Sequence, residues 1–170
     1  MKQLLKSFCK LITSKINNMI TSSKLEQIKL QQNIQAQVQL QRNKVVYAFM
    51  LQIAQTLYEA LHSSTYHGIT PLHSPSEIYI EDYTLSPQGT LLYHFSISKS
   101  VDYPINSTAL NCIQKRMNAD IARYRHKIIS QHGETYAMAN YPLLYHEILV
   151  TSIKDIGFNV IVTVASRVHP

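Results

Sequence analysis

The sequence of 170 residues has few glycines, few cysteines and no tryptophan. With only 4 glycines, a glycine-rich phosphate-binding loop is nearly excluded, and neither GxGxxG nor a P-loop pattern occurs. The 2 cysteines, Cys9 and Cys112, form no CxxC pair, so we expect neither a disulfide framework nor a cysteine-based zinc site. Free thiols fit a reducing compartment, and we therefore expect a cytoplasmic protein, at the membrane surface if part of it binds lipid.

Long apolar runs are also lacking. No stretch reaches the roughly 18 consecutive apolar residues that a membrane-spanning helix needs. The N-terminus has no uninterrupted apolar segment of the kind found in secretory signal peptides. We therefore expect neither a transmembrane helix nor a signal peptide. The length suits one domain with a real core and is short for two.

Acidic residues are nearly missing from the N-terminal quarter of the chain. Residues 1–42 contain seven Lys or Arg residues, and Glu26 is their only acid. Nine basic and nine acidic residues balance one another in the remaining chain, so the net charge of +6 belongs to this segment. A segment of this kind is expected to contact something anionic.

Residues 1–21 have the pattern of a basic amphipathic helix, with Lys6 and Lys10 opposite the apolar face. Such a helix can lie in an anionic membrane interface, or it can pack on the domain or on a second copy. The partners that we expect are therefore a second copy, another protein or an anionic membrane surface. The apolar face consists of Leu4, Leu5, Phe8, Leu11, Ile12, Ile16, Met19 and Ile20.

A second, longer helix is expected to begin at the capping box Ser23–Glu26 and to run to about Leu61. Residues 34–41 alternate apolar residues with glutamine, which is a strand period, but Gln, Ala and Leu favour a helix. A helix of this length exceeds what one small domain needs. We therefore divide the chain into a basic helical arm at 1–44, with a coiled-coil seam as one use for it, and a domain at 45–170.

The rest of the sequence predicts two β-hairpins on either side of a helix. Strands are expected at residues 77–85, 90–99, 143–153 and 158–166, with a turn at 86–89 and a connector at 134–142. The fold class is α+β, with the order α-ββ-α-ββ and a four-stranded antiparallel sheet covered by helices on one face. A curved sheet that encloses a pocket is the alternative.

The helix between the hairpins is predicted at residues 107–131, capped by Asn106 or Ser107 and ended by Gly133. Its apolar residues recur every three or four positions, as in an amphipathic helix with one buried face. That buried face consists of Leu110, Ile113, Met117, Ile121, Tyr124 and Ile128.

Catalytic and metal-binding patterns are weak. The 8 histidines include neither HExxH nor HxxxH, and no GxSxG elbow is present. His94, His146, Glu147 and Asp82 lie in predicted strands and would support acid–base chemistry if the hairpins brought them together. Ordinary sheet-surface polarity explains them more simply. We therefore assign no catalytic residue, no metal ligand and no cofactor.

Arg116, Arg123 and Lys127 form the best basic group outside the arm, although Asp120 interrupts it. These side chains are the candidates for anion binding, and nucleic acid is the alternative partner. The leading interpretation is a non-enzymatic interaction or assembly protein. On that interpretation the arm mediates self-association or attachment to an anionic membrane. The residues that it uses are Leu4, Phe8, Leu11, Ile12, Lys6 and Lys10. A small-molecule-binding or enzymatic α+β pocket is the third interpretation.

Overall fold

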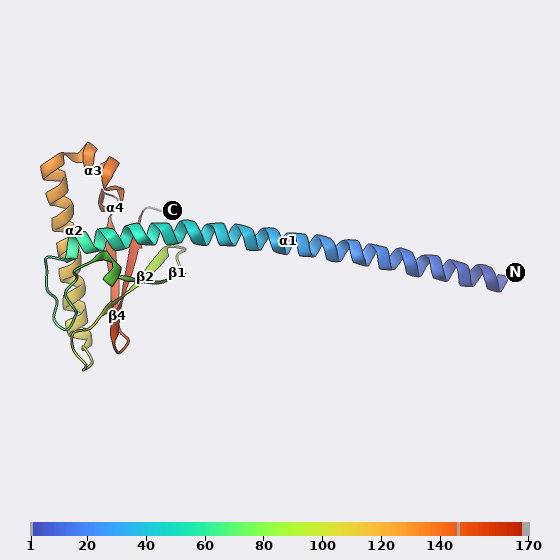
Figure 1. Cartoon of the computed structure of the whole chain (residues 1–170), viewed down its shortest axis with the longest axis horizontal. Helices are drawn as coiled ribbons and strands as arrows, with labels where there is room; N and C mark the ends of the chain where they lie inside the picture. The colour runs from blue at the N-terminus through green and yellow to red at the C-terminus, as the bar shows by residue number, and fades with distance from the viewer. Residues whose placement is uncertain (1, 146, 168–170) are drawn as a thin grey trace. The chain divides into compact units, whose positions relative to one another are not determined.

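The computed structural model describes residues 2–145 and 147–167. The chain forms two compact units, which meet between residues 45 and 46, and each is described by itself below. The elements in chain order are α1 (Lys2–Leu61), η1 (Pro75–Glu77), β1 (Tyr79–Leu85), β2 (Leu91–Ser98), α2 (Ser107–His132), α3 (Glu134–Asn140), α4 (Pro142–Tyr145), β3 (Ile148–Asp155) and β4 (Asn159–Ser166) (Figure 1). The α+β class and the order α-ββ-α-ββ are confirmed.

The expected division of the first 61 residues into two helices is wrong. α1 is one helix of 60 residues, and the capping box at Ser23 does not begin a new one. Hydroxyl groups in this segment bond back into the helix, as Thr21 Oγ1 does to the carbonyl oxygen of Asn17 at 2.7 Å. No glycine or proline occurs before Gly68, so nothing in the backbone chemistry ends the helix earlier. The alternating stretch at 34–41 is helical too.

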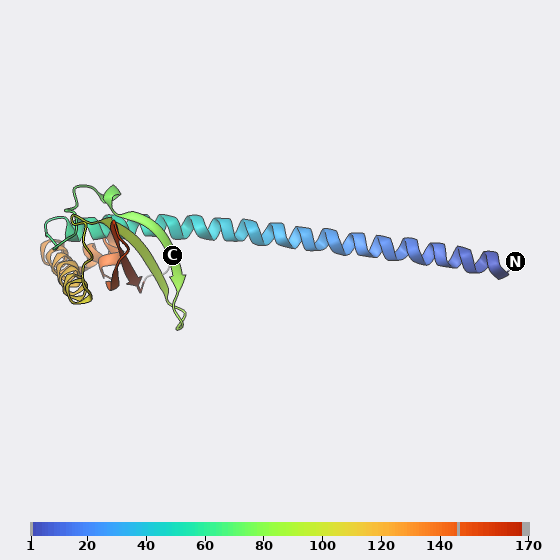
Figure 2. The same ribbon diagram turned by 90° about the horizontal axis from the view of Figure 1, so that it is seen from below.

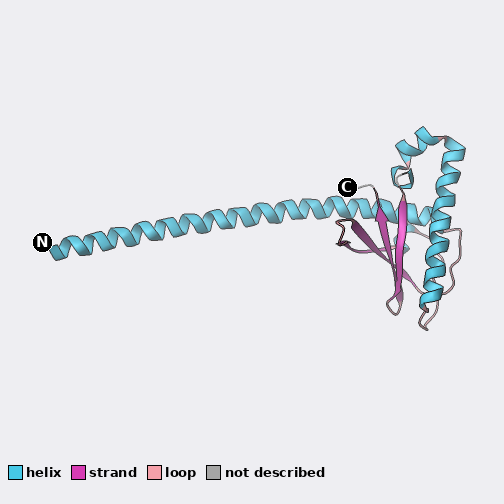
Figure 3. Ribbon diagram, turned by 180° about the vertical axis from the view of Figure 1, so that it is seen from behind, coloured by secondary structure: helices cyan, strands magenta, loops and turns pink. Residues whose placement is uncertain are grey.

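The second unit is an antiparallel sheet with the strand order β1-β2-β4-β3. The second strands of the two hairpins pair at its centre, where His94 lies opposite Thr163. α2 and the end of α1 cover one face, and the other face carries no helix (Figures 2 and 3). The four-stranded antiparallel sheet, made of two hairpins that flank a helix, is confirmed.

The core lies between this sheet and the two helices. Alternate residues of the central strands point into it, and the rings of Phe49 and Tyr93 meet there with centroids 5.4 Å apart. α1 and α2 also touch directly, because Tyr124 Oη donates to Glu59 Oε2 at 2.9 Å. The core consists chiefly of Val46, Phe49, Met50, Ile53, Leu57, Leu61, Tyr93, Phe95, Ile97, Ile113, Met117, Ile121, Ile128, Val150, Ile153, Val160, Val162 and Val164.

α2 begins at Ser107, and the Asn106 side chain accepts the Ala109 amide at 2.8 Å as its N-cap. The predicted buried face is present, although Leu110 and Tyr124 are only partly buried. Asp120 was expected to interrupt the basic face, and its Oδ1 does lie 2.8 Å from Arg123 Nη1. Its side chain is buried at the edge of the apolar stripe, where Tyr66 Oη donates to it at 2.7 Å.

The connector after α2 differs from the prediction. Residues 143–145 were expected to begin a strand, but they form α4, and β3 begins at Ile148. Leu143 and Leu144 are both buried, as neighbouring residues of a short helix packed on the core can be. Pro142 occupies the first helical position, where its missing N–H costs nothing.

Stability should depend strongly on the buried face of α2. Met117 is 1% exposed, so Met117→Ala should cost about 2–5 kcal/mol of unfolding free energy through lost packing and a residual cavity. The exposed Lys127 on the same helix is the control, and Lys127→Ala should change stability by less than about 0.5 kcal/mol. Urea unfolding of the three proteins measures both values. A larger cost for Lys127→Ala than for Met117→Ala would mean that the helix is placed the wrong way round.

Candidate interaction surfaces

The arm, taken here as residues 2–45, is exposed at every position whose side chain is described. Of the predicted interaction residues, Phe8 is 65%, Leu11 59% and Ile12 42% exposed. Lys6 and Lys10 are also exposed, while Leu4 lies outside the described side chains. The first half of the arm therefore presents apolar and cationic groups together.

The second half of the arm presents a narrower apolar stripe. Ile34 is 52%, Val38 63% and Val45 53% exposed, and these three residues lie close to one line along the helix. Glutamine is the commonest residue on the remaining surface. Within the described part of the chain, none of the helices combines the length and apolar character needed to cross a bilayer.

The predicted anion-binding residues on α2 have partners inside the domain. Arg123 Nη1 lies 2.8 Å from Asp120 Oδ1, and the Arg116 guanidinium lies over the Tyr66 ring at 5.4 Å from its centroid. Burial and the bond to Asp120 raise the pKa of the Tyr66 phenol, so it stays protonated and keeps donating. Lys127 is exposed. Anion binding by this group stays a prediction.

The histidine and carboxylate residues predicted in the strands come together only in part. His94 and Asp82 line one shallow hollow of about 360 Å³ on the open face of the sheet, together with Glu81. The His94 ring nitrogens meet two hydroxyls, Thr84 Oγ1 at 2.8 Å and Thr163 Oγ1 at 3.0 Å. Among the residues the structure describes, no three potential ligands are grouped to hold a metal ion.

Glu147 is not among the described residues that line this hollow. His146 lies outside the described residues. Glu147 has φ +60° and forms an ion pair with Arg167 at 3.3 Å. The strand pattern had placed Glu147 inside a strand, but it lies between α4 and β3. A carboxylate that is paired in this way is not positioned beside His94.

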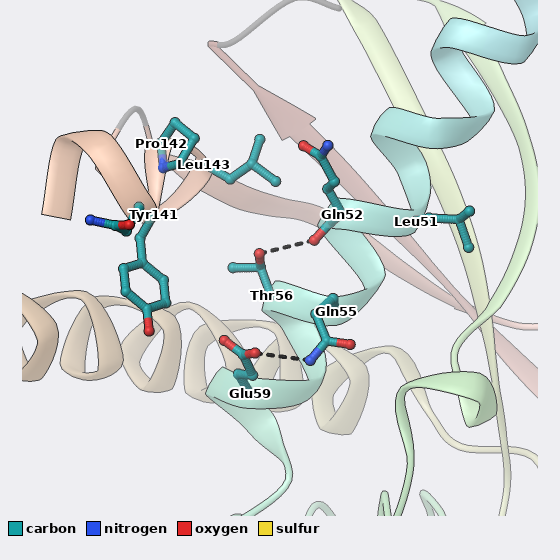
Figure 4. Close-up of a pocket in the computed structure, with 9 residues that line it drawn as sticks. Leu51, Gln52, Gln55, Thr56, Glu59, Tyr141, Pro142 and Leu143 are labelled. Carbon is teal, nitrogen blue, oxygen red and sulfur yellow. Dashed lines mark hydrogen bonds between the residues drawn. The ribbon is translucent and has the colours of Figure 1, made fainter.

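A cavity of about 510 Å³ lies between the end of α1 and the connector α3–α4 (Figure 4). Gln52, Gln55, Thr56 and Glu59 of α1 face Tyr141, Pro142 and Leu143 across it. Glu59 is held by Gln55 Nε2 at 2.9 Å as well as by Tyr124, so its charge is already partnered. The sequence did not reveal this cavity, because residues 140–143 were expected to connect to a strand.

Polar contacts of Asp155 fix the turn between β3 and β4. Lys99 Nζ, almost fully buried, lies 2.7 Å from Asp155 Oδ2, which also accepts the Ile105 amide at 2.8 Å. Asp155 Oδ1 accepts the Gly157 amide at 2.9 Å. Phe158, 94% exposed, follows directly on this rigid turn. Sequence reasoning assigned no role to Lys99, Asp155 or Phe158.

The polar contacts of Asp155 predict a pH dependence of stability. The two backbone amides and the Lys99 ammonium lower the pKa of Asp155 to about 2, below its value in the unfolded chain. A group with a lowered folded pKa stabilises the fold above its unfolded pKa and loses that contribution as the pH falls toward 2. Thermal unfolding between about pH 5 and pH 2 should therefore show a smaller decline for Asp155→Asn than for the natural protein. Parallel declines would contradict this role of Asp155.

Comparison of the chain with protein-family models, with curated proteins and with solved structures found no match.

Proposed function

We propose that the protein is a non-enzymatic interaction protein that its basic arm attaches to an anionic membrane surface. The observation that carries the proposal is the simultaneous exposure of apolar and cationic side chains along the arm. Complete burial of a side chain such as Phe8 or Leu11 is worth about 1.5–3 kcal/mol, so an arm that leaves them in water favours any partner that covers them.

The composition of residues 4–20 favours lipid as that partner. Their apolar residues extend over about half of the helix circumference, which is wider than the seam of a coiled coil. Lys6 and Lys10 lie on the other half, and no acidic residue occurs before Glu26. Each lysine near an anionic surface contributes about 1 kcal/mol, and anionic lipids are concentrated in the cytoplasmic leaflet. The proposal therefore places the protein in the cytoplasm, at the membrane.

Self-association is the second candidate function, and the second half of the arm favours it. The stripe of Ile34, Val38 and Val45 is narrow, as a helix partner requires, and glutamine is common beside it. A seam of this kind suits a second copy of the arm. The two functions are compatible, because they use different halves of α1.

Vesicle binding tests the membrane proposal. The double substitution Phe8→Glu and Leu11→Glu should abolish binding of the full chain to vesicles of mixed neutral and anionic phospholipid, because it charges the apolar face. Ser7→Glu and Ser14→Glu add the same charge on the polar half and are the matched control, with a partial loss expected. Lys6→Gln with Lys10→Gln should weaken binding by roughly 30-fold at low salt. Cosedimentation at low and moderate salt measures all four proteins.

Two results would contradict the membrane proposal. One is a full chain that stays in the supernatant at low salt. The other is equal loss of binding in the apolar-face variant and in its control. A chain that begins at Asn43 should bind no vesicles and should keep the melting temperature of the full chain. A drop of several degrees would mean that the arm belongs to the core.

Sedimentation equilibrium tests the second candidate. The full chain should associate in a concentration-dependent manner that moderate salt hardly changes, because apolar contacts are not screened. Ile34→Glu with Val38→Glu should dissociate it, whereas Gln32→Glu with Gln35→Glu, which adds the same charge away from the stripe, should not. A chain that remains monomeric at all concentrations, or two variants that behave alike, would rule out this seam.

A further inference from the structure

The two edges of the sheet differ in how they are covered. At the β3 edge, α2 supplies side chains that replace a neighbouring strand. Asn118 Oδ1 accepts the Val150 amide at 2.8 Å, and Asn118 Nδ2 donates to the Val150 carbonyl oxygen at 2.9 Å. Gln114 Nε2 donates to the Thr151 carbonyl oxygen at 3.0 Å. These bonds occupy backbone groups of Val150 and Thr151 through which another strand would pair, so this part of the edge is covered.

The β1 edge has no such cover. β1 is the outermost strand on its side, and within residues 2–145 and 147–167 no strand pairs with its outer edge. A groove of about 580 Å³ lies along its first half, between the strand and α1. Tyr47, Leu51 and Gln55 form the helix side of this groove, and Ile78 and Ile80 form the strand side. An exposed strand edge beside an apolar groove is the arrangement that binds an extended peptide as an added strand.

The charge around this edge is negative. Residues 45–98 contain no lysine and no arginine, and their four acids are Glu59, Glu77, Glu81 and Asp82. Three of these four lie in or just before β1. Glu81 and Asp82 line the hollow on the open face of the sheet, while the groove lies on the helix-covered face. The two sides of the edge therefore have different chemistry, one apolar and one acidic.

We propose that the outer edge of β1 binds an extended segment of a partner protein in which apolar and basic residues alternate. Successive side chains of a strand point to opposite faces of the sheet. In an added strand, the apolar side chains would enter the groove beside Leu51, and the Lys or Arg side chains would meet Glu81 and Asp82. A second copy of β1 is a poor occupant, because two-fold pairing would set the acidic strands against each other. This surface is independent of the arm.

Peptide titration of the full chain tests the proposal. The probe is an acetylated and amidated heptapeptide in which lysine alternates with valine. It should shift the ¹⁵N–¹H signals of Tyr79 and Ile80 and slow the hydrogen exchange of the one whose N–H faces the outer edge, leaving Val150 unchanged. A peptide with glutamate in place of lysine should leave the β1 signals unchanged, which separates this site from attraction to the basic arm. A lysine–valine peptide with alternate N-methylated amides should also fail, because it cannot pair with the edge.

Two pairs of substitutions test where the peptide binds. Leu51→Lys charges the groove, and Gln52→Lys adds the same charge one residue away, outside it. Asp82→Lys reverses a charge at the edge, and Asp102→Lys makes the same change at a residue that lines neither the groove nor the hollow. The first member of each pair should weaken binding roughly ten-fold, and the second should change it less than about two-fold. All four positions are exposed, so the variants should fold.

The proposal is overturned if the peptide leaves the β1 amides unchanged or if the glutamate or N-methylated peptide protects them equally. It is also overturned if both members of a pair weaken binding alike. Slow, concentration-dependent exchange of Tyr79 and Ile80 without peptide would assign the edge to a second copy and would refute the basic-segment proposal.

Discussion

The pairing of β2 with β4 is the constraint on which the rest of the folded domain depends. Each α-β-β half has two strands that its own helix can cover on one face only. The central pairing joins the two halves into one sheet with one core face. Phe95 and Val162, opposite each other on these strands, are fully buried under the helices. Once the central strands are joined, β1 and β3 become edges, and each edge needs protection or a partner.

The two halves meet that need differently. α2 lies close enough to β3 for Asn118 to bond both backbone groups of Val150, and this costs the helix a polar residue near its buried face. α1 and the first half of β1 border the groove lined by Leu51 and Gln55. The two α-β-β units, although similar, thus differ in the surroundings of their edge strands.

Buried polar groups fix the irregular parts of the domain. Asp120 holds Tyr66 from the loop after α1, and Asp155 holds Lys99 and the Ile105 amide beside the β3–β4 turn. Each carboxylate binds groups that are distant in sequence. Each therefore attaches a loop to an element of the domain beside which the loop would otherwise lie without a polar bond. α1 combines two environments in one helix, since its last residues lie in this core and its first 45 lie on a separate exposed unit.

The sequence by itself determined the local elements, because they follow from periodicity and turn chemistry. The helix over Ser107–His132, its cap at Asn106 and the turn before Gly89 are written in neighbouring residues. It also determined the charge and apolar residues of the arm. Only the tertiary structure decided the strand order, the cover over β3 and the partners of Arg116, Arg123 and Asp155. These depend on contacts between residues tens of positions apart, such as Lys99 and Asp155. Such a contact produces no periodic pattern in the sequence. Two local signals also predicted the wrong structure. Ser23 could cap a helix, but nothing before it ends the preceding one. Leu143 could extend a strand, but it is buried together with Leu144.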